Sequence, residues 1–183
     1  EDFDLTIGRG SISVYKIGSD SVESLGTALT EDFHLSYPFL LEIGDELYMC
    51  PETHESRDIR LYRCIDFPLK WELERVLIED IDAADTNIFF KNDKWWLMTN
   101  VCSGNLKDHD SELHIYMSEN LFSGEWIPHH QNPVIFDSSH ARNGGLIIDG
   151  DEHYRVQQNP DFDTYGRSFS ISRIVTINSH TYS

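Results

Sequence analysis

A strand–turn–strand pattern occurs three times in this chain and constrains its fold more than any other feature. The copies are YPFLLEIGDELYMCPE (37–52), DTNIFFKNDKWWLMTN (85–100) and NGGLIIDGDEHYRVQQ (143–158). In each copy an apolar stretch runs into a tight turn that contains Asp, and a second stretch with a central aromatic residue follows. The copies align without gaps, which predicts three β-hairpins of one repeated unit.

A further β-rich stretch follows each hairpin, at 59–64, 113–118 and 169–174, and a similar stretch at 12–17 has no hairpin before it. Two of these stretches lead through a turn and a Trp, Trp71 or Trp126, into an expected fourth strand. Four strands in roughly 50 residues are typical of one β-propeller blade. No window carries apolar residues at helical spacing for three turns. The sequence therefore predicts an all-β, propeller-type domain.

The repeat divides this single domain, 1–183, into a partial blade at 1–30, blades at 34–80 and 83–136, and an incomplete blade at 140–183. The expected number of strands, roughly 13, is lower than the sixteen or more that a closed propeller of four to eight blades needs. We therefore expect an open arc, a fragment, or a ring that is completed by a second copy of the chain.

Charge and apolar content exclude several classes of partner. The chain has 14 Lys and Arg against 32 Asp and Glu, a net charge of −18, which repels phosphate backbones, so we expect no nucleic acid partner. The apolar clusters at 87–90 and 95–98 are far shorter than the ~20 residues of a spanning helix, so we expect no membrane insertion. Cys50, Cys64 and Cys102 lack metal-ligand spacing, and as reduced thiols they favour a reducing compartment such as the cytoplasm.

Four blocks carry a resemblance to a known family: HLSYPFLLEIGDELYMCPET (34–53), DIRLYRCIDFPLKWE (58–72), ADTNIFFKNDKWWLMTN (84–100) and ARNGGLIIDGDEHYRVQQN (141–159). They resemble the N-terminal propeller domain of glucosamine inositolphosphorylceramide transferase-like proteins. That family is similar to the five-bladed propellers of arabinanases, levansucrases and related glycosidases. The resemblance implies an incomplete propeller of the five-bladed type that handles sugars. By this resemblance, we expect residues 1–183 to include neither the glycosidase blade that supplies the base carboxylate nor the transferase domain of the plant proteins.

The repeat also predicts which residues converge, because the first strand of each propeller blade lines the channel. The alignment places Tyr37, Asp85 and Asn143 at the starts of first strands. Glu52, Asn100 and Gln158 stand at the ends of second strands. Residues at or near these positions, and residues with an aromatic or guanidinium group close by, are the candidates for sugar binding. They are Tyr37, His34, Asn100, Arg142, Asn143, Arg155, Gln158 and Trp96. Trp95 and Tyr165 are further aromatic candidates for stacking.

Asp85 and Glu52 are the candidate catalytic residues. Two carboxylates that flank a glycosidic bond can act as general acid and base, at about 6.5 to 9.5 Å apart in an inverting enzyme. The alternative is that Asp85 bonds neighbouring amides and that Glu52 lies on a solvated loop. The Arg residues could likewise hold sugar oxygens or pair with acidic residues.

We expect no cofactor, although the channel could hold a cation such as calcium. DHD (108–110) is interpreted as a solvated turn, and SSH (138–140) beside Asp137 is too local for a hydrolase triad. The predicted function is recognition of a carbohydrate or sugar-containing small molecule. The alternatives are a glycoside hydrolase and an assembly module, which would dimerise or dock with a transferase domain.

Overall fold

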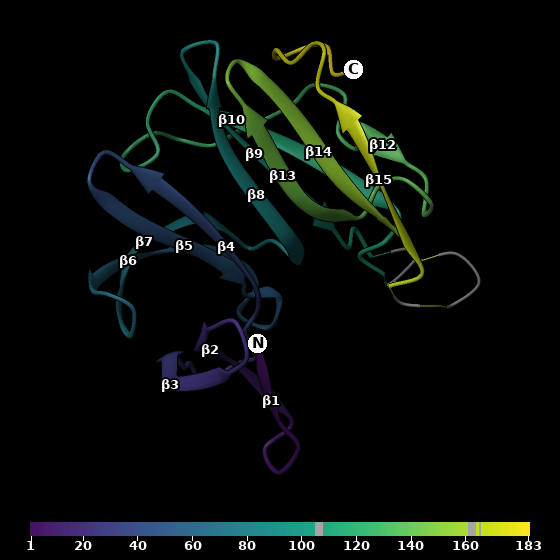
Figure 1. Ribbon diagram of the computed structural model, residues 1–183. Coiled ribbons are helices and arrows are strands. Elements are labelled where there is room, and N and C mark those ends of the chain that lie inside the picture. The colour runs from purple at the N-terminus through teal and green to yellow at the C-terminus, as the bar shows by residue number, and fades with distance from the viewer. Residues whose placement is uncertain (105–107, 161–163, 165) are drawn as a thin grey trace. The chain divides into compact units, whose positions relative to one another are not determined.

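The computed structural model describes residues 1–104, 108–160, 164 and 166–183 (Figure 1). Among them, one turn of 3₁₀ helix at His54–Ser56 is the only regular element that is not a β-strand. The strands form four antiparallel sheets in chain order, which confirms the all-β prediction. None of the described helical segments is long and apolar enough to cross a membrane. The chain forms two compact units, Glu1–Ile81 and Asp82–Ser183, and each contains two of the sheets.

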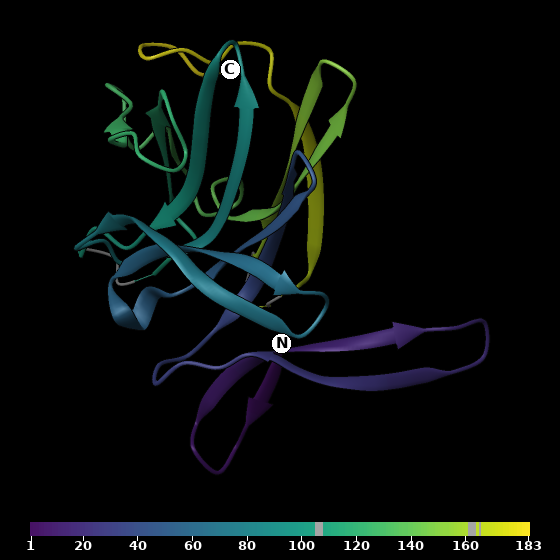
Figure 2. The ribbon, with the colours of Figure 1, turned by 90° about the vertical axis from the view of Figure 1, so that its left-hand side faces the viewer.

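The first unit contains a three-stranded sheet, in the order β1-β2-β3, and a four-stranded sheet, β4-β5-β6-β7. In the three-stranded sheet, β2 and β3 form a long hairpin (Figure 2). The core shared by the two sheets contains Ile12, Leu35, Met49 and Tyr62, all almost fully buried. The strand bounds are β1 (Asp2–Asp4), β2 (Arg9–Ile17), β3 (Val22–Leu29), β4 (Ser36–Ile43), β5 (Glu46–Glu52), β6 (Asp58–Asp66) and β7 (Lys70–Glu79).

The second unit contains a sheet in the order β11-β10-β9-β8, with β12 also paired to β10, and a sheet in the order β13-β14-β15. One core cluster contains Phe89, Trp96 and Leu113 of the first of these sheets and Ile174, which follows β15, and Leu146 of β13 packs against it. The strand bounds are β8 (Ala83–Lys91), β9 (Lys94–Val101), β10 (Glu112–Ser118), β11 (Ile127–Pro128), β12 (Ile135–Phe136), β13 (Asn143–Asp149), β14 (Glu152–Asn159) and β15 (Ser168–Arg173).

The three predicted hairpins are confirmed as β4–β5, β8–β9 and β13–β14. Each has a two-residue turn, at 44–45, 92–93 and 150–151. The first residue of each turn, Gly44, Asn92 or Gly150, has a left-handed backbone conformation. Gly and Asn tolerate this conformation best, and for this reason the turns were visible in the sequence. The predicted third strands are β6, β10 and β15.

Two details differ from the expectation. The first sheet has a third strand, because Asp2–Asp4 pairs with residues 9–11 of β2. The fourth strand expected after Trp126 is not continuous: only Ile127–Pro128 and Ile135–Phe136 pair with β10. Pro133, close to the second of these segments, has no N–H to give to a strand ladder, which accounts for part of the interruption.

The side chain of Asn132 takes the place of the missing strand. Its Oδ1 accepts a hydrogen bond from the Ile115 N–H, and its Nδ2 donates to the Ile115 carbonyl, both at 2.8 Å. A side-chain amide thus makes the two bonds that a residue of a neighbouring strand would make. Because Ile115 is fully buried, its backbone N–H cannot turn to water instead.

Replacing Asn132 with Ala is expected to lower the free energy of unfolding by about 1 to 2 kcal/mol, because the Ile115 N–H loses its acceptor. Chemical denaturation monitored by Trp fluorescence measures this change. Gln131→Ala, at the exposed neighbouring position, is the control and is expected to change stability by less than about 0.5 kcal/mol. Equal stability of the two variants would contradict the role given to Asn132.

Three histidines meet where residues 129–130 contact the C-terminal segment. The His130 N–H donates to the Ser179 carbonyl at 3.2 Å, and the His130 and His180 rings are stacked with their centroids 4.3 Å apart. Burial lowers the pKa of the His129 imidazole. The Asn178 and Thr181 carbonyls oppose this shift, and the two neighbouring imidazoles add to it.

A lowered pKa means that the folded protein favours neutral His129, whereas the unfolded chain takes up a proton below about pH 6.5. The stability that neutral His129 provides is therefore present above that pH and is lost as the pH falls below it toward the lower pKa of the folded state. Melting curves recorded above and below about pH 6.5 are expected to show a smaller loss in His129→Gln than in the parent protein. His140→Gln, at an exposed site, is the control. Parallel pH profiles for all three proteins would refute the assignment.

Candidate functional site

The first strand of each hairpin contains a β-bulge near its start. The register shifts by one residue between Ser36 and Phe39, between Ala84 and Asn87, and between Asn143 and Gly145. These are equivalent positions of the repeat. Bulges bend a strand and redirect side chains, and they are common beside binding and active sites.

Two bulges contain a non-glycine residue with left-handed backbone, Tyr37 with a φ of 42° and Asp85 with a φ of 51°. Such a conformation costs roughly 1 to 3 kcal/mol and persists only where the surroundings hold it in place. In the third hairpin the left-handed position falls on Gly145, with a φ of 145°. Tyr37 and Asp85, which the sequence predicted as site residues, thus occupy strained positions at the same point of two repeats.

Asn143 is the centre of a buried polar network in the second unit. Its Nδ2 donates to the carbonyls of Asp85 and Met98, at 2.8 and 3.1 Å, and so joins β13 to the sheet of β8 and β9. Its backbone N–H donates to Asn100 Oδ1 at 2.7 Å, and its carbonyl accepts from Gln158 Nε2 at 2.7 Å. Asn143 and Asn100 are completely buried. The structure therefore brings together four of the predicted site residues.

Arg155 supports this network from β14. Its Nε donates to Asn143 Oδ1 at 2.7 Å, and its other nitrogens donate to the carbonyls of His140 and Ala141 and to Gln157 Oε1. Only 1% of Arg155 is exposed. A guanidinium with this many hydrogen bonds to protein groups is a positioning residue for Asn143, so a direct contact with a ligand is disfavoured.

Arg142 lies beside the network and is partly open to solvent. Its Nε is 2.9 Å from Asp85 Oδ2, and its Nη1 is 2.7 Å from Asp110 Oδ1. The side chains of Arg142 and Asp110 are 18% and 31% exposed, whereas that of Asp85 is 4% exposed. Burial alone would lower the pKa of Arg142, but the two carboxylates outweigh it and raise that pKa. This ion pair favours the ionised form of Asp85, which is then a hydrogen-bond acceptor.

Asp110 is a site residue that the sequence analysis missed. It was assigned to a solvated turn, and Asp108 does fold that turn by accepting the N–H groups of Asp110 and Ser111. His109 pairs with Asp82 at 2.8 Å, so the three residues of DHD face different partners. The pairing of Asp110 with Arg142 spans 32 residues, and no local pattern predicts it.

In the first unit, the predicted site residues Glu52 and His34 both lie beside His54. Glu52 Oε1 lies 2.8 Å from His54 Nδ1, and the Glu52 side chain is 11% exposed. His34 Nδ1 accepts the Gly10 N–H at 2.8 Å, which fixes the ring, and the His34 and His54 rings are 6.2 Å apart. Glu52 is thus a half-buried carboxylate with an imidazole neighbour, so it is not on a solvated loop.

The remaining predicted residues lie elsewhere. Trp96 is 1% exposed and its indole N–H donates to the Lys91 carbonyl, at the hairpin-turn end of β9 and away from Asn100. Trp95 packs on Phe90, with centroids 5.3 Å apart. Tyr165 lies outside the described residues.

The SSH motif (138–140) has no catalytic geometry, and the DHD motif (108–110) has no metal-binding geometry. The Ser139 hydroxyl and the Asp137 carboxylate both contact Nδ1 of His140, at 2.7 and 2.8 Å, whereas a triad uses opposite nitrogens of the ring. Within the described part of the chain, no cluster of three or more His, Cys, Asp or Glu side chains could hold a metal ion.

Replacing Asn143 with Ala is expected to lower the free energy of unfolding by about 2 to 4 kcal/mol, because buried carbonyls and the Arg155 guanidinium lose partners. Gln158→Ala is the matched control, since it removes one bond to the Asn143 carbonyl and is expected to cost about 1 kcal/mol. Urea denaturation measures both changes. Similar losses in the two variants would show that Asn143 is not the centre of the network.

The family model described as glucosamine inositolphosphorylceramide transferase 1, N-terminal, matches residues 5–183. Glucosamine inositolphosphorylceramide transferase 1 of Oryza sativa subsp. japonica is 38% identical over 163 residues, which cover 87% of this chain and 22% of that protein. The protein of the same name from Arabidopsis thaliana is 35% identical over 164 residues, 87% of this chain and 21% of that protein. The chain therefore spans about a fifth of the length of these relatives.

Solved structures of sugar-processing enzymes have a similar fold. Inulosucrase from Halalkalicoccus jeotgali, bound to kestose, matches with a TM-score of 0.61 and 11% identity over 93% of this chain and 59% of that chain. The exo-β-1,3-galactanase from Phanerochaete chrysosporium with galactose matches with a TM-score of 0.56 and 14% identity over 76% of this chain and 35% of that chain. At such identities the likeness shows the fold, an incomplete propeller of the five-bladed type, and confirms the expected fold class.

Proposed function

Because the chain belongs to the family of glucosamine inositolphosphorylceramide transferase 1 N-terminal domains, we propose that it recognises the sugar part of a glycan substrate. The proposed binding surface is the end of the second unit where β8 and β13 begin. Asp85, Asn100 and Asn143 form its buried base, and Arg142 with Asp110 forms its exposed edge.

The observation that carries this proposal is the partly exposed pair Arg142–Asp110 on a buried polar base. Sugars are recognised by hydrogen-bond donors and acceptors held in fixed positions. A guanidinium fork supplies planar donors, and a carboxylate supplies acceptors for vicinal hydroxyls or for an amine. Buried neighbours fix both groups before a ligand arrives, which reduces the entropy lost on binding.

The net charge of the chain indicates which charge the sugar ligand should carry. A net charge of −18 favours neutral or cationic ligands over phosphorylated ones. The relatives are named for a transferase of glucosamine, whose amine is protonated near neutral pH. We therefore propose an amino sugar as the ligand class, with its ammonium group on Asp110.

The experiment is a binding titration with D-glucosamine, with N-acetylglucosamine and myo-inositol as neutral comparisons. Asp110→Asn is expected to weaken glucosamine binding about tenfold, because it removes a charged acceptor without changing shape. Asp137→Asn changes the net charge equally at an exposed site and is expected to leave the affinity within about twofold. Calorimetry or ligand-observed NMR provides the dissociation constants. Equal effects of the two variants, or no binding by the parent protein, would overturn the proposal.

A glycoside hydrolase is the second candidate, favoured by the half-buried Glu52 beside His54. In that case the chain turns over chromogenic glycosides, and Asp85→Asn or Glu52→Gln abolishes turnover while the fold is kept. Binding of glucosamine without turnover supports recognition alone.

The third candidate is an assembly module, which is favoured by β15, because all six of its residues are exposed. An assembly module would show a melting temperature that depends on protein concentration.

A further inference from the structure

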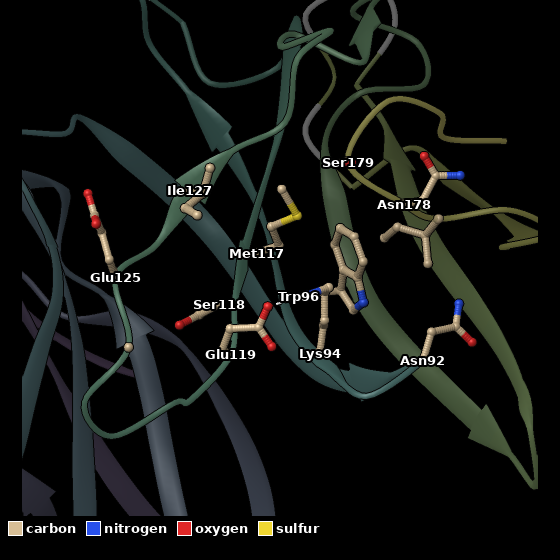
Figure 3. Close-up of a pocket in the computed structure, with 12 residues that line it drawn as sticks. Asn92, Lys94, Trp96, Met117, Ser118, Glu119, Glu125, Ile127, Asn178 and Ser179 are labelled. Carbon is tan, nitrogen blue, oxygen red and sulfur yellow. Dashed lines mark hydrogen bonds and ion pairs between the residues drawn. The ribbon is translucent and has the colours of Figure 1, made fainter.

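A cavity of about 510 Å³ opens beside the turn of the β8–β9 hairpin (Figure 3). Asp85 lies near the start of β8, at the other end of the same hairpin. The walls of the cavity come from the hairpin turn, from the loop that follows β10, and from the C-terminal residues 177–179. Small-molecule sites usually have volumes of about 300 to 1,000 Å³. This cavity shares no residue with the proposed sugar-binding surface, and the inference drawn from it does not depend on that proposal.

The cavity exists because the outer edge of β10 is covered by a loop where a full strand would otherwise lie. Only Ile127 and Pro128 pair with β10 in this region. The loop is held close to β10 at Gly124, whose N–H donates to the Asn120 carbonyl at 2.8 Å. A Cβ atom on Gly124 would lie 2.2 Å from Ser118 Oγ, so only glycine allows this approach.

The floor of the cavity is apolar. Trp96 and Ile177 close it and are 1% and 3% exposed. The Trp96 indole N–H already donates to the Lys91 carbonyl, at 2.9 Å, so the ring offers the cavity no free polar group. Met117 and Ile127 form the wall, and Figure 3 shows the Met117 side chain between Ile127 and the Trp96 ring. Such a lining favours a ligand with an apolar body.

The rim of the cavity is negative. Lys94 pairs with Glu119, and Glu125 adds a second carboxylate, so two acidic groups stand against one basic group. Asn92 and Asn178 contribute neutral amides to the rim. A cationic group on the ligand would therefore meet a favourable field at the mouth, strengthened by the net charge of −18.

We infer that this cavity is a second binding site, which takes a small organic cation with an apolar body. The ammonium group lies at the rim near Glu125, and the hydrocarbon part contacts Trp96, Met117 and Ile127. The two carboxylates disfavour an anion of the same size, and a neutral analogue binds through the apolar contacts alone.

Three probes of similar size separate these contributions: phenethylammonium, 2-phenylethanol and 3-phenylpropionate. Amide chemical-shift titrations with each provide a dissociation constant and the place of binding. We expect the cation to bind about two- to fivefold more tightly than the alcohol, as an exposed ion pair allows, and the anion to bind most weakly. Equal affinities for the three probes, or no binding, would contradict the inference.

Two pairs of variants test the residues. Glu125→Gln is expected to reduce the affinity for the cation to that for the alcohol and to leave the alcohol unaffected. Glu23→Gln makes the same change of charge at an exposed position of the first unit and is expected to change neither. Ile127→Trp fills the cavity and is expected to weaken all bound probes at least fivefold, whereas Ile148→Trp, at a similarly exposed Ile of β13, is not. Equal changes of affinity in the two variants of either pair would show that the probes do not bind in this cavity.

Discussion

The side chain of Asn143 is the contact on which the second unit depends. It stands at the start of β13, donates to the carbonyls of Asp85 and Met98, and accepts the Arg155 guanidinium. No water reaches it, so each of these bonds has to be made within the protein. An amide with two donors and one acceptor oxygen meets this demand, whereas an apolar residue of the same size would leave charged and polar groups unpaired. The two sheets are therefore joined at the end where the predicted site residues gather.

The bulges explain why a repeated structural unit can carry a site that is not repeated. Each hairpin has one extra residue near the start of its first strand, and the equivalent repeat positions within or beside these bulges are Tyr37, Asp85 and Asn143. The backbone is alike, and the side chains differ in charge, shape and hydrogen-bonding capacity. In the second unit, one bulge supplies a carboxylate that pairs with Arg142, and the next supplies the amide that holds the sheets. Strain at Asp85 is tolerated because the ion pair and the Asn143 bond fix its side chain and its carbonyl.

Much of this fold was predictable from the sequence, because hairpins leave local signals. Gly44–Asp45 and Asn92–Asp93 mark turns by residue type, and the alignment of the copies shows which positions are equivalent. The interruption after Trp126 was not foreseen, because it depends on the Asn132 side chain reaching Ile115 across 17 residues. Asp110 was missed for the same reason, since its partner Arg142 is distant in sequence. The cavity near Trp96 could not be predicted either, because it depends on how closely the loop at Gly124 approaches β10.

In the proposed function, the buried network around Asn143 is the base of a sugar-binding surface. The most direct measurement is a map of amide chemical-shift changes in the ¹⁵N-labelled protein as D-glucosamine is added. If glucosamine binds there, the largest changes are expected at Asp85, Asn100, Asp110 and Asn143, together with the Nε–H signal of Arg142. Changes confined to the hairpin turns at 92–93 and 150–151, or uniform small changes over the whole chain, would contradict this proposal.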